Sequence, residues 1–318
     1  GPGAGDIIEI LNRQNPILDD ATATACNMGA THRHTIRTGL PTSAWGRLYQ
    51  GIPQSKATVQ QVDDTTGFPE AYASLDARML DLSENAAIQR LVDSAPYMES
   101  MNQEMATSIF YADTATSPEK FKGLAARYNT IGGTGIGQQV ISGAGAGSDN
   151  TSIWFVTWGD HATTLLYPKG TKAGISMEDK GEQKTLDASG NPFFTKDALY
   201  RWHIGLAVKD WRYNARIANI DVSNMQAGSV DVWALLRKAY YRLQSRRRDH
   251  IGSRIAIYMN RDVLEILDAQ SSDRALLAAT PNYTGLSQGT IEGKEVRTYR
   301  GIPIRETDAI LNTEAVVS

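Results

Sequence analysis

The longest amphipathic pattern of the chain lies between residues 83 and 111. Apolar side chains recur there every three or four residues on one helix face, and glutamates and glutamines point away from it. The apolar positions are Leu91, Met98, Met101, Met105 and Ile109. Because Pro96 lacks the amide donor that a helix interior needs, we expect a kink or a fresh start at Ser94. The pattern predicts a short helix followed by a longer one.

Two strand-like runs precede this helix, at residues 55–62 and 70–80, and the turn-forming residues 63–69 join them. The pattern predicts a β-hairpin with Asp63 and Asp64 at its tip. The first run is polar on both faces, and an isolated two-stranded ribbon is marginally stable in water. We therefore expect this hairpin to lean on a neighbouring surface.

The first 45 residues show little periodicity. One helical turn is expected at residues 6–11, where Asp6 can cap it, and Pro16 stops the pattern. The remainder has neither a helical nor a strand period. This segment is predicted to be an extended arm that another surface orders.

The middle of the chain changes from glycine-rich to β-like. Residues 132–147 are rich in glycine and are predicted to be a flexible connector. Strands are expected at residues 153–158, 163–167 and 200–208. Beyond Lys209 the alternation slips by one residue and continues to Ile217, which predicts a bulge or tight turn at 209–210.

The last third alternates between helix and strand patterns and is predicted to be a second compact unit. Helices are expected at residues 230–245, 261–268 and 273–279, with Asn260 capping the second of them. Strands are expected at residues 255–259, 296–299 and 315–317.

Composition adds limits to this picture. The chain has 318 residues, of which 41% are hydrophobic and 21% charged, as in ordinary folded proteins with about two units. We expect no membrane span, because no run approaches about 18 apolar residues, and no targeting segment at the start. A net charge of −3 argues against wrapping of nucleic acid by the whole chain. With Cys26 alone, no disulfide can form within the chain, which favours synthesis in a reducing compartment.

Two patterns raise the possibility of chemistry. Residues 285–289 match the G-x-S-x-G nucleophile elbow around Ser287, but turn residues flank it and the last histidine, His250, comes before the serine. A glycine turn is favoured over a hydrolase. Cys26, His32 and His34 could bind a metal, but their spacing matches no zinc pattern. Asp19 or Asp20 would be the fourth ligand. A free thiol and exposed histidines are favoured, and the glycine runs lack a phosphate-loop ending.

The helix expected at residues 230–245 carries one basic patch. Lys238, Arg242 and Arg246 lie at i, i+4 and i+8, opposite an apolar stripe, and Arg247 and Arg248 follow. Phosphate binding is one interpretation. A solvated face, or salt bridges to a neighbouring subunit, is the favoured one.

Four parts of the chain resemble the major capsid proteins of tailed bacteriophages, the short-tailed phages in particular. These parts are residues 38–47 with 49–51, residues 109–113 with 118–129, residues 154–159 with 167–170, and residues 299–304. The resemblance implies an α+β chain with the Hong Kong 97-type capsid fold. The parts of that fold would be an N-terminal arm at 1–45, an extended hairpin loop at 46–82, a peripheral domain with a spine helix and long strands at 83–225, and an axial domain at 226–318. Because the long strands precede the axial part here, a permuted connectivity is expected.

The resemblance also implies a function. Copies would form pentamers and hexamers of an icosahedral phage head around double-stranded DNA, which they would touch non-specifically. Candidate contacts between subunits are Arg47, Lys56, Asp63 and Asp64. Expected partners are portal, scaffolding and cementing proteins, with no cofactor, no enzymatic activity and no membrane. The protein would assemble in the host cytoplasm and end in the virion. The alternatives are an encapsulin-like shell and a serine hydrolase that uses Ser287.

Overall fold

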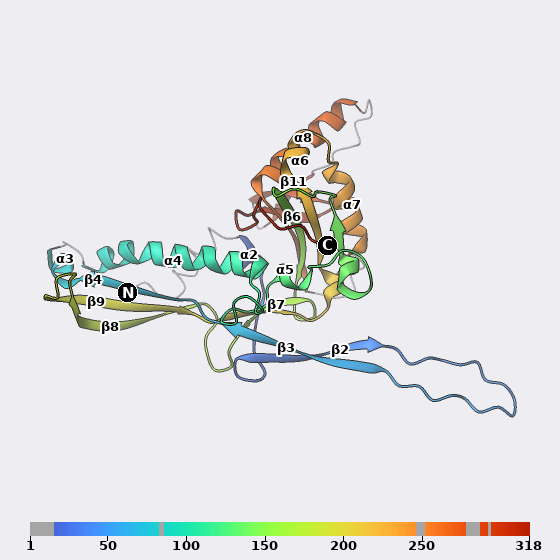
Figure 1. Ribbon diagram of the computed structural model, residues 1–318, viewed down its shortest axis with the longest axis horizontal. Coiled ribbons are helices and arrows are strands. Elements are labelled where there is room, and N and C mark those ends of the chain that lie inside the picture. Colours follow the sequence, from blue (N-terminus) through green and yellow to red (C-terminus); the bar gives the residue numbers. More distant parts are fainter. Residues whose placement is uncertain (1–15, 83–85, 246–251, 278–286, 292–293) are drawn as a thin grey trace.

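The computed structural model describes residues 16–82, 86–245, 252–277, 287–291 and 294–318. Two sheets share these residues. The small sheet carries the long helix, the large sheet carries the shorter helices, and a hairpin of two strands projects from the junction between them (Figure 1). The helical turn expected at residues 6–11 lies outside the described residues.

The large sheet has the strand order β13-β14-β15-β12-β6-β7-β10-β3-β2, and short strands β1, β5 and the longer β11 pair at its side. The strands, in chain order, are β1 (Ala23–Ala25), β2 (Thr31–Gly39), β3 (Thr58–Gly67), β5 (Val140–Ser142), β6 (Asn150–Trp158), β7 (Thr163–Tyr167), β10 (Ile204–Val208), β11 (Ala215–Asp221), β12 (Arg254–Met259), β13 (Ser287–Ile291), β14 (Lys294–Tyr299) and β15 (Ile302–Glu306).

Strand β6 is buried along its whole length because both faces of the sheet are covered. Trp154 and Trp158 pack on one face with the long helix α4 (Ala86–Tyr111), α5 (Leu124–Arg127) and α2 (Pro16–Asp20). On the other face, Ile153 and Phe155 pack with three further helices. These are α6 (Val222–Gln226), α7 (Val232–Arg242) and α8 (Arg261–Leu277).

The small sheet has the order β4-β9-β8 and lies beneath α4 (Figure 1). Its strands are β4 (Glu70–Asp76), β9 (Pro192–Trp202) and β8 (Ile175–Leu186), with α3 (Ala77–Leu82) after β4. Ala73 and Ala198 pack against the methionine face of α4, and Arg90 of α4 is 2.9 Å from Asp179 of β8. The exposed strand β8 is rich in charge, which protects a sheet edge from unwanted pairing.

A buried ionic network fixes the long helix to the large sheet. Arg216 of β11 lies 2.8 Å from Glu314, donates to the carbonyl of Tyr128, and lies over the ring of Trp154. The Tyr111 hydroxyl, at the end of α4, donates to Glu314, and burial together with this carboxylate raises the pKa of the phenol. One ion pair therefore joins a helix end, a central strand and the C-terminal segment.

The predicted hairpin is wrong in its pairing. Strand β3 pairs antiparallel with β2 across the loop 40–57, whereas β4 pairs with β9 in the other sheet. Of the turn expected at 63–69, residues 63–67 continue β3, because this strand has a partner on each side where it enters the sheet. Part of the segment read as an unpatterned arm is therefore strand β2.

The predicted domain boundary at 225/226 does not divide the structure. Strands β5, β6, β7, β10 and β11 precede it, yet they share one sheet with β12 to β15. The chain leaves this sheet after β7, forms β8 and β9 in the small sheet, and returns in β10. This excursion accounts for the early long strands, so no permutation is needed to explain them.

Three local predictions also differ from the structure. Helix α4 runs through Pro96, which is exposed, so the fresh start expected at Ser94 does not occur. The glycine-rich connector contains the 3₁₀ helix η1 (Gly135–Gln139) and strand β5, which pairs with β11. The strand expected at 315–317 is absent from these described residues, where the Val317 amide instead donates to the Asn219 side chain.

Other expectations agree with the structure or nearly so. Strand β7 has the predicted bounds, and Asn260 accepts from the Asp262 amide at the start of α8. The run 200–208 is split at His203, with β9 in one sheet and β10 in the other. A tight turn follows Asp210, as the phase slip predicted, and forms the 3₁₀ helix η2 (Trp211–Tyr213). The two last helices are one, α8, up to Leu277.

Candidate functional site

The most prominent surface feature is the projecting hairpin, residues 31–67, formed by β2, β3 and the loop between them. It continues the large sheet at its β10 side and extends away from the rest of the molecule, and its loop is the part farthest from the body (Figure 1). Alternate residues of β2 face the body: His32, His34 and Ile36 are the more buried, and Arg33, Thr35 and Arg37 are exposed. This alternation is the strand period of two, and it marks a strand within the segment predicted to be an extended arm.

The hairpin loop, residues 40–57, is exposed throughout. Its exposed apolar side chains include Trp45 at 100%, Leu48 at 92% and Tyr49 at 108% relative exposure. A turn closes where the Gln50 amide donates to the Arg47 carbonyl, and Tyr49 takes a positive φ of 62°. Large apolar side chains gathered on one exposed projection are typical of a surface that another protein covers.

A buried ion pair anchors the base of the hairpin to the body. The side chain of Asp64 is 4% exposed and lies 2.6 Å from Arg127, at the end of α5. The same guanidinium donates to the carbonyls of Leu206 on β10 and of Lys122. Arg127 therefore links β3 to the adjacent strand β10 and to Lys122, which lies just before α5. Breaking such a pair leaves an uncompensated buried charge.

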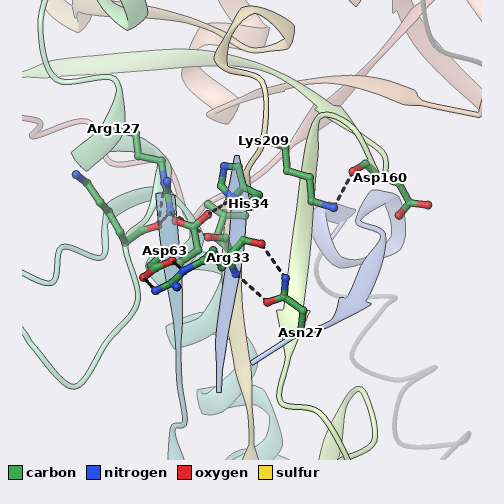
Figure 2. Close-up of polar contacts among 10 residues, drawn as sticks. Asn27, Arg33, His34, Asp63, Arg127, Asp160 and Lys209 are labelled. Carbon is green, nitrogen blue, oxygen red and sulfur yellow. Dashed lines mark hydrogen bonds and ion pairs between the residues drawn. The ribbon is translucent and has the colours of Figure 1, made fainter. Parts of the chain in front are cut away.

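On the exposed face of the same strands, Arg33 forms a bidentate pair with Asp63, both distances being 2.7 Å. The hydrogen bonds from Arg33 lower the pKa of the Asp63 carboxyl. Asn27 fixes the backbone of Arg33 from the other side, because its side chain both donates to the carbonyl and accepts from the amide (Figure 2). The two acidic residues thus lie at the base of the hairpin and pair within the subunit.

Two glycines allow the hairpin to approach the body closely. A Cβ at Gly205 would lie 2.7 Å from the Thr65 carbonyl, and one at Gly67 would lie 2.9 Å from the Glu119 carbonyl. Both contacts are shorter than real Cβ contacts, and both are with backbone, which cannot move aside cheaply. The pairing of Gly205 with Thr66 in the register of β10 and β3 depends on this space.

The predicted site residues are found in different places. Arg47 and Lys56 lie in the exposed hairpin loop, as expected for contact candidates. The expectation that Asp63 and Asp64 form the tip is wrong, because β3 continues through them and their partners are Arg33 and Arg127. Arg127 itself was not singled out, although it lies in a stretch that carries the family resemblance.

The basic patch is only partly within the described residues. Lys238 is exposed on α7. Arg242 donates to the carbonyls of Gln138 and Val140, so it binds the end of η1 and the start of β5 within the same subunit. Arg246, Arg247 and Arg248 lie outside the described residues.

In the described residues, the geometry supports neither the hydrolase interpretation nor the metal site. Ser287 is the first residue of strand β13, not part of the glycine turn that was predicted, and an elbow would need a helix after it. Cys26 is a free thiol, as expected, and it is buried beside Leu166 and Ala207. The expectation of exposed histidines is wrong, because His32 is 9% exposed and the side chain of His34 is 10% exposed. Asp20 pairs with Arg305 at 2.9 Å. Within the described ranges, no group of three acidic, histidine or cysteine side chains is placed to hold a metal ion.

Comparison with known proteins identifies the family. The model of the family described as major capsid protein GP7 matches residues 2–318. The chain belongs to this family. A chain of the cryo-EM structure of bacteriophage Epsilon15 is 30% identical, with a TM-score of 0.71, and the match covers 94% of this chain and 88% of that one. No curated protein matches the chain.

More distant structures share less of the chain. The capsid of the native GTA particle is 10% identical with a TM-score of 0.44, over 63% of this chain and 88% of that one. The SrpI encapsulin complex from Synechococcus elongatus PCC 7942 is 11% identical with a TM-score of 0.44, over 64% of this chain and 86% of that one. The phage-head interpretation rests on the family model and on the Epsilon15 match.

The family and the Epsilon15 match establish the coarse function. The chain is an α+β protein with the Hong Kong 97-type capsid fold, and it is a shell protein of a phage head and thus of the virion. Its role is structural, and it assembles with copies of itself. In the part of the chain that the structure describes, no helix is long and apolar enough to cross a bilayer.

Proposed function

We propose that copies of this chain form the pentamers and hexamers of an icosahedral head around double-stranded DNA, and that the projecting hairpin of each copy lies across a neighbouring copy. The observation that carries the proposal is the full exposure of the hairpin loop, with Trp45, Leu48 and Tyr49 bare on a projection that extends away from its own subunit. Covering these side chains would supply about 25 cal/mol per Å² of apolar area removed from water.

The charge of the loop indicates what it meets. Between residues 40 and 57 the sequence contains Arg47 and Lys56 and no acidic residue. An acidic groove lies along α4 on the body of the molecule, lined by Glu99 and by Glu306 and Asp308 at the end of β15. One oxygen of Glu99 is buried without a hydrogen-bond partner among the described residues. The loop of one copy and the groove of the next are therefore complementary in charge.

The capsid family also suggests the partners of the shell and the parts of the subunit. Portal and scaffolding proteins would set the size and the unique vertex of the head, and a cementing protein is a further candidate partner. DNA would touch the inner surface non-specifically, in keeping with the net charge of −3. Assembly would take place in the host cytoplasm. The four parts of the subunit would be an arm, the projecting hairpin, a peripheral part with α4 and the small sheet, and an axial part with the large sheet.

Charge reversal tests the proposed contact. Arg47→Glu with Lys56→Glu should reduce the yield of closed shells at least about tenfold, since it places like charges across each repeated interface. Adding Glu99→Lys and Asp308→Lys should restore much of the yield. The matched control is Lys169→Glu with Lys172→Glu, two exposed lysines on the body, which should assemble normally.

The outcomes separate the two parts of the proposal. Loss of shells without rescue would keep the role of the loop and reject the acidic groove as its partner. Normal shells from the loop variant would reject both.

A further inference from the structure

A buried histidine cluster lies at the base of the projecting hairpin. His32 and His34 lie on the same face of β2, with ring centroids 6.3 Å apart, and His34 Nδ1 is 3.7 Å from Asp64 Oδ2, too far for a hydrogen bond. Among the described residues, both ring nitrogens of His34, Nδ1 of His32 and Oδ2 of Asp64 have no hydrogen-bond partner. Four polar atoms are thus buried together and unsatisfied.

The charges around the rings are unbalanced. Arg127 neutralises Asp64 at 2.6 Å, and Lys209, at the end of β10, adds a second positive charge that acts on both histidines. Burial, followed by the charge of Lys209, lowers the pKa of His32. Burial also lowers the pKa of His34, where Asp64 opposes the shift but His32, Arg127 and Lys209 add to it. Both rings are therefore neutral at neutral pH.

We propose that His32 and His34 are a proton-sensitive latch that keeps the hairpin base attached to the body while both rings are neutral and loosens it in mild acid. Protonation would bring the buried cluster from two positive charges to four, against the one buried carboxylate of Asp64. The more exposed Asp63 also acts on His34, but it is already paired with Arg33. The added positive charges would weaken a short strand pairing, because β3 pairs with β10 through Gly67 and Thr66.

The direction with pH follows from proton binding. A histidine whose pKa is lowered in the attached state binds fewer protons there than in the loosened state, where its pKa is about 6.5. The latch is therefore at full strength above about pH 6.5 and weakens as the pH falls below that value. This inference concerns the hairpin within one subunit and does not depend on what covers the loop.

Hydrogen exchange of the full-length, unassembled chain tests the latch. Protection factors, corrected for the intrinsic effect of pH, should fall at least about tenfold for β2 and β3 between about pH 7.5 and pH 5.5. Protection of β6 and β11 should stay constant and serves as the internal reference. His32→Gln with His34→Gln should abolish the difference between the two pH values, whereas His161→Gln, on the turn between β6 and β7, should retain it.

A second variant keeps the test decisive if the double variant loses protection everywhere. Lys209→Gln removes one of the positive charges that face the rings, so it should reduce the loss of protection in acid while β6 remains protected. Equal acid loss in wild type, the double variant and Lys209→Gln would overturn the proposal, and so would constant protection of β2 in the wild type.

Discussion

At the residue scale, two buried arginines hold the parts of the subunit together. Arg127 joins the projecting hairpin to the large sheet, and Arg216 joins the end of α4 to the same sheet through Glu314. Each guanidinium also donates to backbone carbonyls, so it satisfies several acceptors from one buried position. The exposed pairs of the chain, such as that of Arg78 with Asp76, have no such role.

Replacement of Arg216 by Met should lower the free energy of unfolding by about 3–5 kcal/mol, because Glu314 would be left as an uncompensated buried charge. Chemical denaturation of the unassembled subunit measures this. Arg78→Met is the matched control, since the side chain is 75% exposed and solvent screens its pair, so its loss should change stability little. A similar loss for both variants would contradict the role assigned to Arg216.

At the scale of elements, the projecting hairpin depends on a close backbone approach. Gly205→Ala would place a methyl group 2.7 Å from the Thr65 carbonyl, so β3 would have to move from β10. We expect a loss of about 1–3 kcal/mol in unfolding free energy and weaker protection of β3 from hydrogen exchange. Gly46→Ala is the control, because a Cβ in that part of the hairpin loop meets nothing within 4 Å. Equal stability of the two variants would show that the approach is not tight.

The sequence was informative where one periodicity dominates. The methionine face of α4 is buried as predicted, with Met98, Met101 and Met105 each at most 4% exposed. β6 was found from its apolar run, which is typical of a strand covered on both faces. In both cases the burial pattern is local to the element, so a single segment of sequence carries it.

The sequence predictions failed where the pairing partner of a strand or charged residue lies far away in the sequence. The segment 55–62 gives a strand, but nothing local shows that its partner is β2, across an exposed loop, and not the next strand along the chain. Strand β8 was missed because nearly all its residues are exposed and five of its twelve are charged, so no apolar alternation marks it. The ion pair that holds the hairpin base could not be predicted either, since Asp64 and Arg127 lie 63 residues apart and meet only in the folded subunit.

At the scale of the whole molecule, the subunit has a compact body and a projection that its own body does not cover. The large sheet is covered on both faces, and the small sheet is covered by α4. The hairpin loop has no such cover, and its apolar side chains are exposed. Subunits that cover one another in a shell need such an uncovered projection. The contrast therefore agrees with the capsid family of the chain.

The central claim is that the chain builds a closed shell and needs its hairpin loop to do so. The most direct measurement is sedimentation, with electron micrographs of the fractions, of the full-length chain and of a variant whose residues 41–56 are replaced by a short Gly-Ser linker. The account predicts closed shells from the full-length chain and folded subunits or small oligomers from the variant. A compact monomer from the full-length chain at every concentration, or closed shells in equal yield from the variant, would contradict it.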